Sequence, residues 1–304
     1  MKARILAASK IHESALELAK EYAEVDVKTG LSEDELAKIM GDYDAIVVRS
    51  KPKVTKAMID AGTKLKVIGR AGVGLDNVDK EAAAAKGVKV VNAPEASTIS
   101  VAEHAIALML SVYRDIPKAR DSLKQGRWDR KLFMGCELYG KTLGLIGFGR
   151  IGKEVAKRAR AFGMEVIVSD PAISSEDAKE YNAKCVEINE VFKTADIISI
   201  HVPALPTTKD LVNKERLAMM KPTAIIVNTS RGHAIDEDAL YEALNEKKIK
   251  GAGLDVYKKE PLEGSPLPGL DNAVCVPHLG ANTDEAQIMA GKIVIEKIRE
   301  ILTA

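Results

Sequence analysis

Short apolar runs alternate with amphipathic stretches along most of the chain. In the first hundred residues the apolar runs have the length of strands, and the stretches between them show the i, i+3, i+4 spacing of helices. Strands that alternate with helices in this way are typical of a parallel sheet covered on both faces. The predicted strands are 4–8, 45–49, 66–70 and 89–92, and the predicted helices are 12–22, 32–40 and 78–86.

A second run of the same kind begins near residue 142. Its predicted strands are 142–147, 165–170, 197–201, 224–229, 251–255 and 273–276. A long helical pattern, about 100–124, separates the two runs, and the tail 284–302 is also helical in period. A length of 304 residues fits two domains. The pattern predicts an α/β protein with two doubly wound parallel sheets, and sequence order alone places one boundary near residue 100.

Composition narrows the class of partner. Hydrophobic residues make up 46% of the chain, which is enough for a sizeable core, and 45 Lys and Arg balance 44 Asp and Glu. A net charge of +1 gives no electrostatic reason to expect nucleic acid or an anionic membrane as partner. We expect no membrane span and no signal peptide, because the apolar runs are too short. The widely spaced Cys136, Cys185 and Cys275 predict free thiols in the cytoplasm and no metal site.

The strongest local motif is the glycine pattern of residues 147–152. Gly147, Gly149 and Gly152 stand between an apolar strand and an amphipathic helix, in the context that a dinucleotide site requires. The first glycine permits a tight turn, the second lets the backbone approach a pyrophosphate, and the third lets helix and strand pack closely. The helix N-terminus then offers N–H groups to the phosphates.

Asp170 ends the strand that follows this helix, where a carboxylate can accept hydrogen bonds from the adenosine ribose. The same carboxylate would repel a 2′-phosphate, and residues 171–175 hold no Arg or Lys. We therefore expect NAD as cofactor in preference to NADP. A glycine turn in a protein without a ligand is the alternative, which the strand, helix and terminal acid together disfavour.

Three polar residues follow later predicted strands, where open parallel sheets bind their ligands. Imidazole suits the proton transfer of alcohol oxidation, because it titrates near neutrality. A neighbouring carboxylate fixes the ring's tautomer, and a guanidinium can grip a substrate carboxylate with two hydrogen bonds. We assign the proton transfer to His278, the neighbouring carboxylate to Glu260 and the binding of the substrate carboxylate to Arg231.

Other histidines compete for the role of base. His233 stands close to Arg231 and is the main rival, whereas His201 ends a strand and is expected to line the cofactor site. Only His278 combines a strand end, a proline turn and a carboxylate candidate; His12 and His104 do not. Glu260, taken alone, is better explained as a solvated residue of a turn; the presence of His278 and Arg231 favours the functional role.

Three segments resemble the arginine, glutamate and histidine motifs of the D-2-hydroxyacid dehydrogenase family. They are 228–240, 251–262 and 276–287, and with the glycine motif they stand in the family's order, within a similarity that covers essentially the whole chain. The resemblance implies two Rossmann-like domains around a cleft. A flavodoxin-like substrate domain would comprise 1–98 and 284–304, with an NAD-binding domain, 99–283, inserted into it. It also implies a homodimer, built largely through the cofactor domains.

The resemblance implies roles for further residues. It gives Arg231, Glu260 and His278 the roles argued above and places Asp255 near the nicotinamide carboxamide. The remaining residues implied along the cofactor are Arg150, Ile151, His201, Pro203, Thr208 and Gly280.

The substrate side resembles the members of the family that oxidise 3-phosphoglycerate. The similar stretches are 47–55, 69–79 and 127–144. The resemblance implies that the backbone N–H groups of Val73 and Gly74 bind the substrate carboxylate and that Arg49 and Arg70 face the anionic substrate. It also implies that one cation, Arg130 or Lys131, reaches a phosphate across the dimer. A solvated surface is the alternative for each cation.

Three departures from the family pattern stand out. Ser97 occupies a position that is usually Asn, and His233 replaces the second glycine of a common Arg-Gly-Gly. The sequence ends at residue 304, without the serine-binding regulatory domain of many relatives, so feedback through that domain is expected to be absent. Two alternatives remain open: a glyoxylate or hydroxypyruvate reductase, and an NAD-sensing corepressor.

Overall fold

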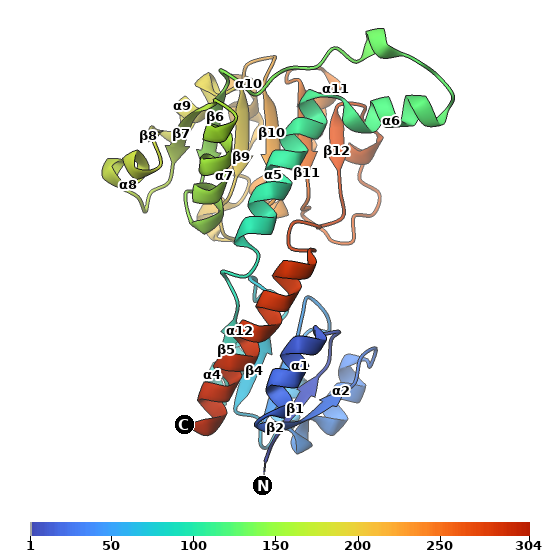
Figure 1. Ribbon diagram of the computed structural model, residues 1–304, viewed down its shortest axis with the longest axis vertical. Helices are drawn as coiled ribbons and strands as arrows, with labels where there is room; N and C mark the ends of the chain where they lie inside the picture. The colour runs from blue at the N-terminus through green and yellow to red at the C-terminus, as the bar shows by residue number, and fades with distance from the viewer. Residues whose placement is uncertain (1) are drawn as a thin grey trace. The chain divides into compact units, whose positions relative to one another are not determined.

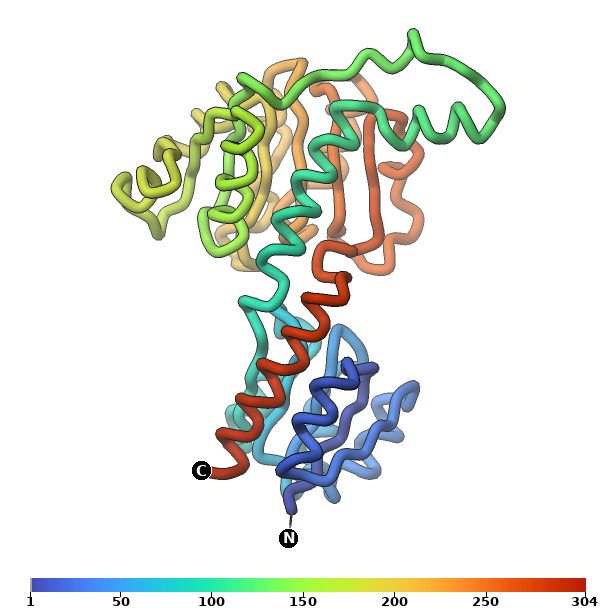
Figure 2. The backbone as a smooth tube through the Cα atoms, in the orientation of Figure 1, coloured from blue at the N-terminus to red at the C-terminus, as the bar shows by residue number. Residues whose placement is uncertain are grey.

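The computed structural model describes residues 2–304 and divides into two compact units. Unit 1 runs up to Thr98 and includes Ala281–Ala304, and unit 2 is Ile99–Gly280. The chain leaves unit 1 once and returns to it with its last helix, α12 (Asp284–Thr303), drawn in red in Figure 2. A single boundary near residue 100 does not account for this return. The second boundary lies at residue 280, three residues before the place that the family resemblance implies.

Unit 1 is built on a parallel sheet. Its described residues form five strands in the order β2-β1-β3-β4-β5, which is the flavodoxin-like order. Strand β2 is missing from the sequence-based prediction, because its Ala-Glu-Val-Asp-Val pattern places charges in an edge strand that is only partly buried. The strands are β1 (Ala3–Ala7), β2 (Ala23–Val27), β3 (Ala45–Val48), β4 (Val67–Arg70) and β5 (Lys89–Asn92).

Helices cover both faces of this sheet. Helix α1 (Glu13–Lys20) and α12 lie side by side on one face, as Figure 1 shows, and bury Ala15, Val294 and Ile298 with the strands. Gly69 of β4 permits this packing, because a Cβ there would lie 2.5 Å from Val294. The other face holds α2 (Glu33–Ile39), α3 (Lys56–Ala61) and α4 (Lys80–Ala85).

Unit 2 has a larger parallel sheet. Its described residues form seven strands in the order β12-β11-β10-β9-β6-β7-β8, so that the first six strands of the unit follow the Rossmann order. The order reverses between β6 and β9, which is where such sheets bind dinucleotides. The strands are β6 (Thr142–Ile146), β7 (Glu165–Ser169), β8 (Ala183–Cys185), β9 (Ile197–Ile200), β10 (Ile225–Asn228), β11 (Gly251–Leu254) and β12 (Ala273–Cys275).

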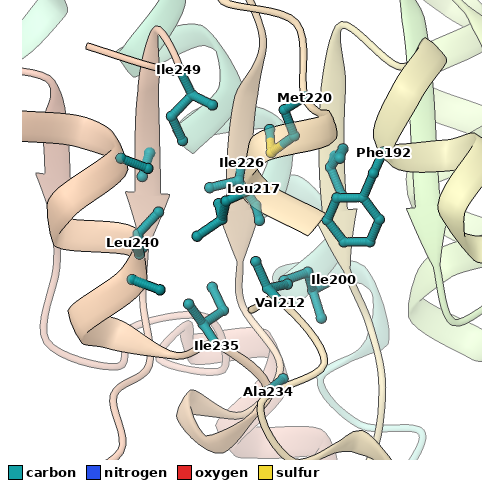
Figure 3. Close-up of a cluster of buried hydrophobic side chains, with 14 of the residues drawn as sticks. Phe192, Ile200, Val212, Leu217, Met220, Ile226, Ala234, Ile235, Leu240 and Ile249 are labelled. Atoms are coloured by element: carbon teal, nitrogen blue, oxygen red, sulfur yellow. The ribbon is translucent and has the colours of Figure 1, made fainter. Parts of the chain in front are cut away.

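Two hydrophobic layers enclose this sheet. Figure 3 shows one of them, where Phe192, Leu217 and Leu240 approach Ile200 and Ile226 of the sheet. Those three side chains come from α9 (Ile188–Thr194), α10 (Lys214–Met219) and α11 (Glu237–Asn245). On the opposite face lie α5 (Thr98–Tyr113), α7 (Arg150–Ala161) and α8 (Ser175–Glu180). Among residues 2–304, no helix is long and apolar enough to cross a membrane.

The predicted long helix at 100–124 is in fact two helices. Helix α5 ends at Tyr113, and α6 (Ile116–Lys124) begins after Asp115, whose φ of 50° lies in the left-handed region. Pro117 stands in the first turn of α6, where its missing N–H is harmless; inside a continuous helix it would remove a hydrogen bond and clash with the preceding turn. The apolar period continues across this break, which is why the sequence pattern alone does not reveal it.

Candidate active site

The glycine motif forms a tight turn between β6 and α7. Gly147 has a φ of 90°, and a Cβ there would lie 2.5 Å from the carbonyl oxygen of His201. A Cβ on Gly152 would lie 2.5 Å from the carbonyl oxygen of Gly147. Both positions therefore require glycine. Gly147 allows the turn and its contact with the end of β9, and Gly152 allows the close approach of α7.

Gly149 stands at the N-cap of α7 and opens the turn outward. A Cβ built there would meet no described atom within 4 Å, and no described side chain caps the helix. The first N–H groups of an α-helix lack intrahelical partners, so this end can receive an anion. Arg150, which is exposed, and Ile151, which is half-buried, are the first two residues of α7. This arrangement fits the pyrophosphate of a dinucleotide.

Asp170 lies beside the same turn, directly after β7. Its Oδ2 accepts a hydrogen bond of 2.7 Å from the Phe148 N–H, and its Oδ1 accepts one of 2.8 Å from the Ala172 N–H. A carboxylate oxygen has two lone pairs, so each oxygen can still accept a second hydrogen bond from a ribose hydroxyl. The aspartate thus combines a structural task at the turn with the capacity to hold a ribose.

His201 follows β9 at the point where the strand order reverses. Its N–H donates to the carbonyl of Ile146 at 2.7 Å, and its Nε2 lies 2.9 Å from Ser199 Oγ. The ring Nδ1 is buried and has no hydrogen-bond partner among residues 2–304. Burial lowers the pKa of His201 to about 4, so the ring is neutral near pH 7.

Pro203 and Thr208 lie in one exposed loop that follows His201. The loop folds back on itself, because Thr208 Oγ1 lies 2.7 Å from the carbonyl oxygen of Pro203 and 3.0 Å from that of Leu205. The ring of His233 closes the loop from the other side, with its Nε2 3.0 Å from Thr208 Oγ1. The structure therefore joins two of the predicted cofactor residues to the predicted rival base.

The residues predicted for chemistry meet at the carboxyl edge of the same sheet. Asn228, Leu254 and Cys275 are register partners at the ends of β10, β11 and β12. Arg231, Asp255 and His278 follow these partners within three residues. The three strand ends therefore bring together residues that are almost fifty positions apart in sequence.

His278 and Glu260 form the central pair of this edge. Nδ1 of His278 lies 2.7 Å from Glu260 Oε2, and Glu260 Oε1 accepts a hydrogen bond of 3.1 Å from the Tyr257 N–H. The glutamate is held in place rather than free in the solvent. When Nδ1–H donates to the carboxylate, Nε2 carries the lone pair that a base needs. About half of the His278 side chain, 49%, is exposed, so a small substrate can approach it.

Hydrogen bonds to Asp255 hold the loop that carries His278 in place. This aspartate is 1% exposed, and its oxygens accept hydrogen bonds of 2.6 Å from the Leu279 N–H and 2.8 Å from the Gly280 N–H. Its backbone carbonyl accepts a further bond from the His278 N–H at 2.9 Å. These contacts hold His278 at a φ of 54°, a conformation that is uncommon for a residue with a Cβ.

Burial by itself raises the pKa of the Asp255 carboxyl. Interaction with His104, whose Nε2 lies 3.3 Å away, and the two backbone hydrogen bonds outweigh burial and lower that pKa. Asp255 is therefore ionised near neutral pH. In unit 2 its carboxylate contacts the loop backbone and His104, so the structure gives it a supporting position under the loop.

Arg231 follows β10 and is half-buried, with Nη1 donating to the Ser230 carbonyl at 2.8 Å. The neighbouring Gly232 packs directly against the peptide between Tyr257 and Lys258, leaving no room for a Cβ. This contact sets the arginine segment against the segment that leads to Glu260. Sequence reasoning did not single out Gly232, because a glycine after an arginine carries no sign of its packing partner.

Tyr257 and Lys258 are two further residues that sequence reasoning missed. The Tyr257 hydroxyl lies 3.1 Å from the Leu254 carbonyl oxygen and 3.0 Å from that of Val276, and so links the ends of β11 and β12. Lys258 Nζ lies 2.9 Å from Asp210 Oδ1. Both residues hold the segment that carries Glu260, and the only signal for them is their position beside the glutamate.

The predicted substrate residues of unit 1 gather at the carboxyl edge of its own sheet. Val48 and Arg70 are register partners in β3 and β4, and Arg49 follows Val48 directly. Burial lowers the pKa of the Arg49 guanidinium, as expected for a cation with reduced access to water. Arg70 folds over the backbone of Gly72, whose φ is 149°.

The loop after β4 is held in place from β5. Asn92 Nδ2 donates a hydrogen bond of 2.5 Å to the Val73 carbonyl, which fixes the peptide between Val73 and Gly74. Ser97, at the position where the family usually has Asn, is buried, with 4% of its surface exposed.

Arg130 and Lys131 lie elsewhere, in the loop that follows α6. Both are exposed and belong to the short 3-10 turn Arg130–Leu132. Figure 1 shows α6 and this loop extending away from the sheet of unit 2. Within unit 2 they are therefore separate from the strand-end residues.

The three cysteines form no disulfide among the described residues. Cys136, Cys185 and Cys275 are free and half-buried.

The chain is similar in sequence to several known proteins. Residues 106–280 match the family described as D-isomer specific 2-hydroxyacid dehydrogenase, NAD binding domain. The chain is 54% identical over 300 residues to a D-3-phosphoglycerate dehydrogenase of Methanocaldococcus jannaschii, covering 98% of this chain and 57% of that protein. It is 49% identical over 293 residues to a hydroxypyruvate reductase of Thermotoga maritima, covering 95% of this chain and 94% of the relative.

Among solved structures, a protein of Thermus thermophilus superposes with a TM-score of 0.91 at 36% identity, covering 99% of this chain and 97% of that one. The chain spans about half the length of the phosphoglycerate dehydrogenases that it matches, with shares of their length between 46% and 57%. The family match covers more than half of the chain, and the two parallel-sheet units are those of its solved neighbours. The chain therefore belongs to the D-isomer-specific 2-hydroxyacid dehydrogenase family.

Proposed function

We propose that this protein oxidises D-3-phosphoglycerate to 3-phosphohydroxypyruvate with NAD, the first step of phosphorylated serine biosynthesis. The observation that carries the dehydrogenase assignment is the 2.7 Å contact between His278 Nδ1 and Glu260 Oε2, at the strand edge that also carries the dinucleotide turn. A histidine oriented by a carboxylate is a suitable proton acceptor for a hydroxyl group.

The residues of the glycine turn fit the cofactor. Gly149 leaves the N-terminus of α7 open to a pyrophosphate, and Asp170 has lone pairs for the ribose hydroxyls. The neighbouring residues Arg150, Ile151, Pro203 and Thr208 would line its path. Bound NAD would accept the hydride from the substrate's C2.

The chain's own residues complete the reaction. His278 Nε2 takes the proton of the C2 hydroxyl as the C2–H bond breaks, and Glu260 stabilises the imidazolium that results. Arg231 would grip the substrate carboxylate with two hydrogen bonds, a geometry that suits a guanidinium. In the reverse direction the imidazolium returns the proton to the carbonyl oxygen.

A phosphorylated substrate accounts for the cations of unit 1. Arg49 and Arg70 stand at neighbouring strand ends, and the partly buried Arg49 has a lowered pKa because of its burial. Burying a cation is costly unless an anionic partner compensates for the lost hydration. A substrate phosphate is such a partner, while the N–H groups of Val73 and Gly74 would receive the carboxylate.

Reduction of hydroxypyruvate or glyoxylate is the second candidate. It uses the same histidine, glutamate and arginine and differs only in the substrate-side contacts. The Thermotoga maritima relative, named a hydroxypyruvate reductase, favours it, because the match covers 94% of that protein.

We further propose that the protein acts as a homodimer in the cytoplasm. The loop after α6 exposes large apolar side chains, with Trp128 83%, Met134 84% and Tyr139 76% exposed. Such a surface is typical of an interface. Arg130 and Lys131, for which the family resemblance implies a contact across the dimer, lie in the same loop. The three free cysteines fit a reducing compartment.

Initial rates with a panel of 2-hydroxy and 2-keto acids test the dehydrogenase assignment. The proposal predicts NAD-dependent oxidation of 3-phosphoglycerate by the wild type, and its near loss in His278→Ala. If none of the acids is oxidised or reduced while NADH still binds, the protein is an NAD-sensing binding protein and the proposal fails.

A further inference from the structure

His233 carries a ring whose position the proposed reaction does not explain. It lies two residues after Arg231, in the short 3-10 turn Gly232–Ala234, and its Nε2 lies 3.0 Å from Thr208 Oγ1. Thr208 belongs to the exposed loop 203–208, which would line the cofactor. The ring therefore connects the segment of the substrate arginine with the loop of the cofactor.

The other hydrogen bonds of the Thr208 hydroxyl indicate whether His233 Nε2 donates to it or accepts from it. A threonine hydroxyl has one hydrogen and two lone pairs. The hydrogen is best used toward the Pro203 carbonyl, the nearest acceptor at 2.7 Å, and one lone pair accepts from the Leu205 N–H at 3.0 Å. The remaining lone pair faces His233, so Nε2 acts as a donor.

We propose that His233 is a positioning residue, whose Nε2–H locks the loop 203–208 in the conformation that receives the cofactor. This inference rests on the proposed use of NAD. The loop is exposed at every residue from Pro203 to Thr207, so few packing contacts hold it. Each hydrogen bond to its end therefore restricts its conformations substantially.

The backbone ties in this region do not depend on the ring. The Asp210 N–H donates to the His233 carbonyl, and the Val212 N–H donates to the Ala234 carbonyl, each at 2.9 Å. A change of the His233 side chain should thus release the loop at Thr208 while the segment after it stays attached. The protein should remain folded.

Two variants separate the hydrogen bond from the bulk of the ring. His233→Leu fills similar space without a donor, whereas His233→Gln places an amide N–H at a reach close to that of Nε2. Losing the hydrogen bond to Thr208 predicts roughly a twofold to tenfold weaker affinity for NADH in His233→Leu, with restoration in His233→Gln. The KM for NAD should rise in the same proportion, and kcat at saturating cofactor should change less.

Hydrogen–deuterium exchange tests the proposed latch, the hydrogen bond between His233 Nε2 and Thr208 Oγ1, without any cofactor. In the cofactor-free protein, the amides of residues 204, 205, 207 and 208 should exchange faster in His233→Leu than in the wild type and return toward wild-type rates in His233→Gln. A double-mutant cycle with Thr208→Val should show non-additive effects on NADH affinity, because both residues make the same bond.

Wild-type exchange rates in His233→Leu, or additive effects in the cycle, would overturn the latch. A wild-type protein that binds no NADH would overturn the proposed function instead, and the exchange experiment would still decide whether the latch exists.

Discussion

The carboxylate of Glu260 lies 2.7 Å from Nδ1 of His278 across a separation of eighteen residues. The two reach each other because they follow neighbouring parallel strands, β11 and β12, which end at the same edge. Asp255 and Tyr257 hold the two connecting segments from within unit 2. The pair is thus a product of the sheet's topology and not of local sequence.

The first prediction concerns this pair. His278→Ala should lower kcat by roughly 10²–10⁴-fold, the usual effect of losing a general acid–base, while the KM for NAD changes little. Glu260→Gln should lower kcat less, because the ring remains but loses its charged partner. Stopped-flow or steady-state rates at saturating substrate measure both effects.

His233→Ala is the matched control, since it removes a ring from a neighbouring segment. It should retain most of the wild-type kcat at saturating cofactor. Loss of turnover in His233→Ala with retention in His278→Ala would show that His233 is the base.

The second prediction concerns cofactor choice. Asp170 stands beside the glycine turn, and its charge should repel the 2′-phosphate of NADP. The wild type should use NAD far better than NADP, and Asp170→Ala should narrow the ratio of the two kcat/KM values. The ratio is the proper readout, because the Phe148 and Ala172 hydrogen bonds are lost as well and affect both cofactors. Equal use of the two cofactors by the wild type would refute the assignment.

The third prediction concerns stability against acid. Burial lowers the pKa of His201 to about 4, below the value of about 6.5 expected in the unfolded chain. Between these values the unfolded state binds the proton and the folded state does not, so stability falls as pH falls through this window. The loss should approach about 1–3 kcal/mol near pH 4.

Urea unfolding at several pH values between about 7 and about 4.5 measures this loss. His201→Gln has no titrating ring and can still reach Ser199, so its free energy of unfolding should fall less over the same range. Identical pH dependence in the two proteins would mean that His201 is not the group responsible.

Much of the fold is visible in the sequence because buried strands here are continuous apolar runs. The ranges predicted for β3, β4, β5 and β9 differ from the observed ones by no more than one residue. The prediction misses two strands with charged residues at partly buried edges: β2, with its Glu and Asp, and β8, which has a lysine at the centre of its three residues. It also fails at Asp115, where a left-handed residue interrupts a helical period that continues on both sides.

The candidate site also holds some residues that the sequence reveals and others that only the structure reveals. Glu260, His278 and Asp170 could be chosen from the sequence because chemistry demands their residue types at strand ends. Gly232 and Tyr257 could not, because their task is to fit segments that are distant in sequence. Thr208 and His233 show the same limit, since only the folded loop reveals that they share a hydrogen bond.

The central claim is that the substrate carries a phosphate. The most direct measurement compares kcat/KM for 3-phosphohydroxypyruvate and hydroxypyruvate with NADH, in the wild type and in Arg49→Ala. Charge-assisted contacts of about 1.5–3 kcal/mol predict a wild-type preference of roughly tenfold to a hundredfold or more for the phosphorylated acid. Arg49→Ala should reduce that preference by penalising the phosphorylated acid more. A wild type that reduces hydroxypyruvate or glyoxylate more efficiently would contradict the account and identify the protein as a reductase of unphosphorylated acids.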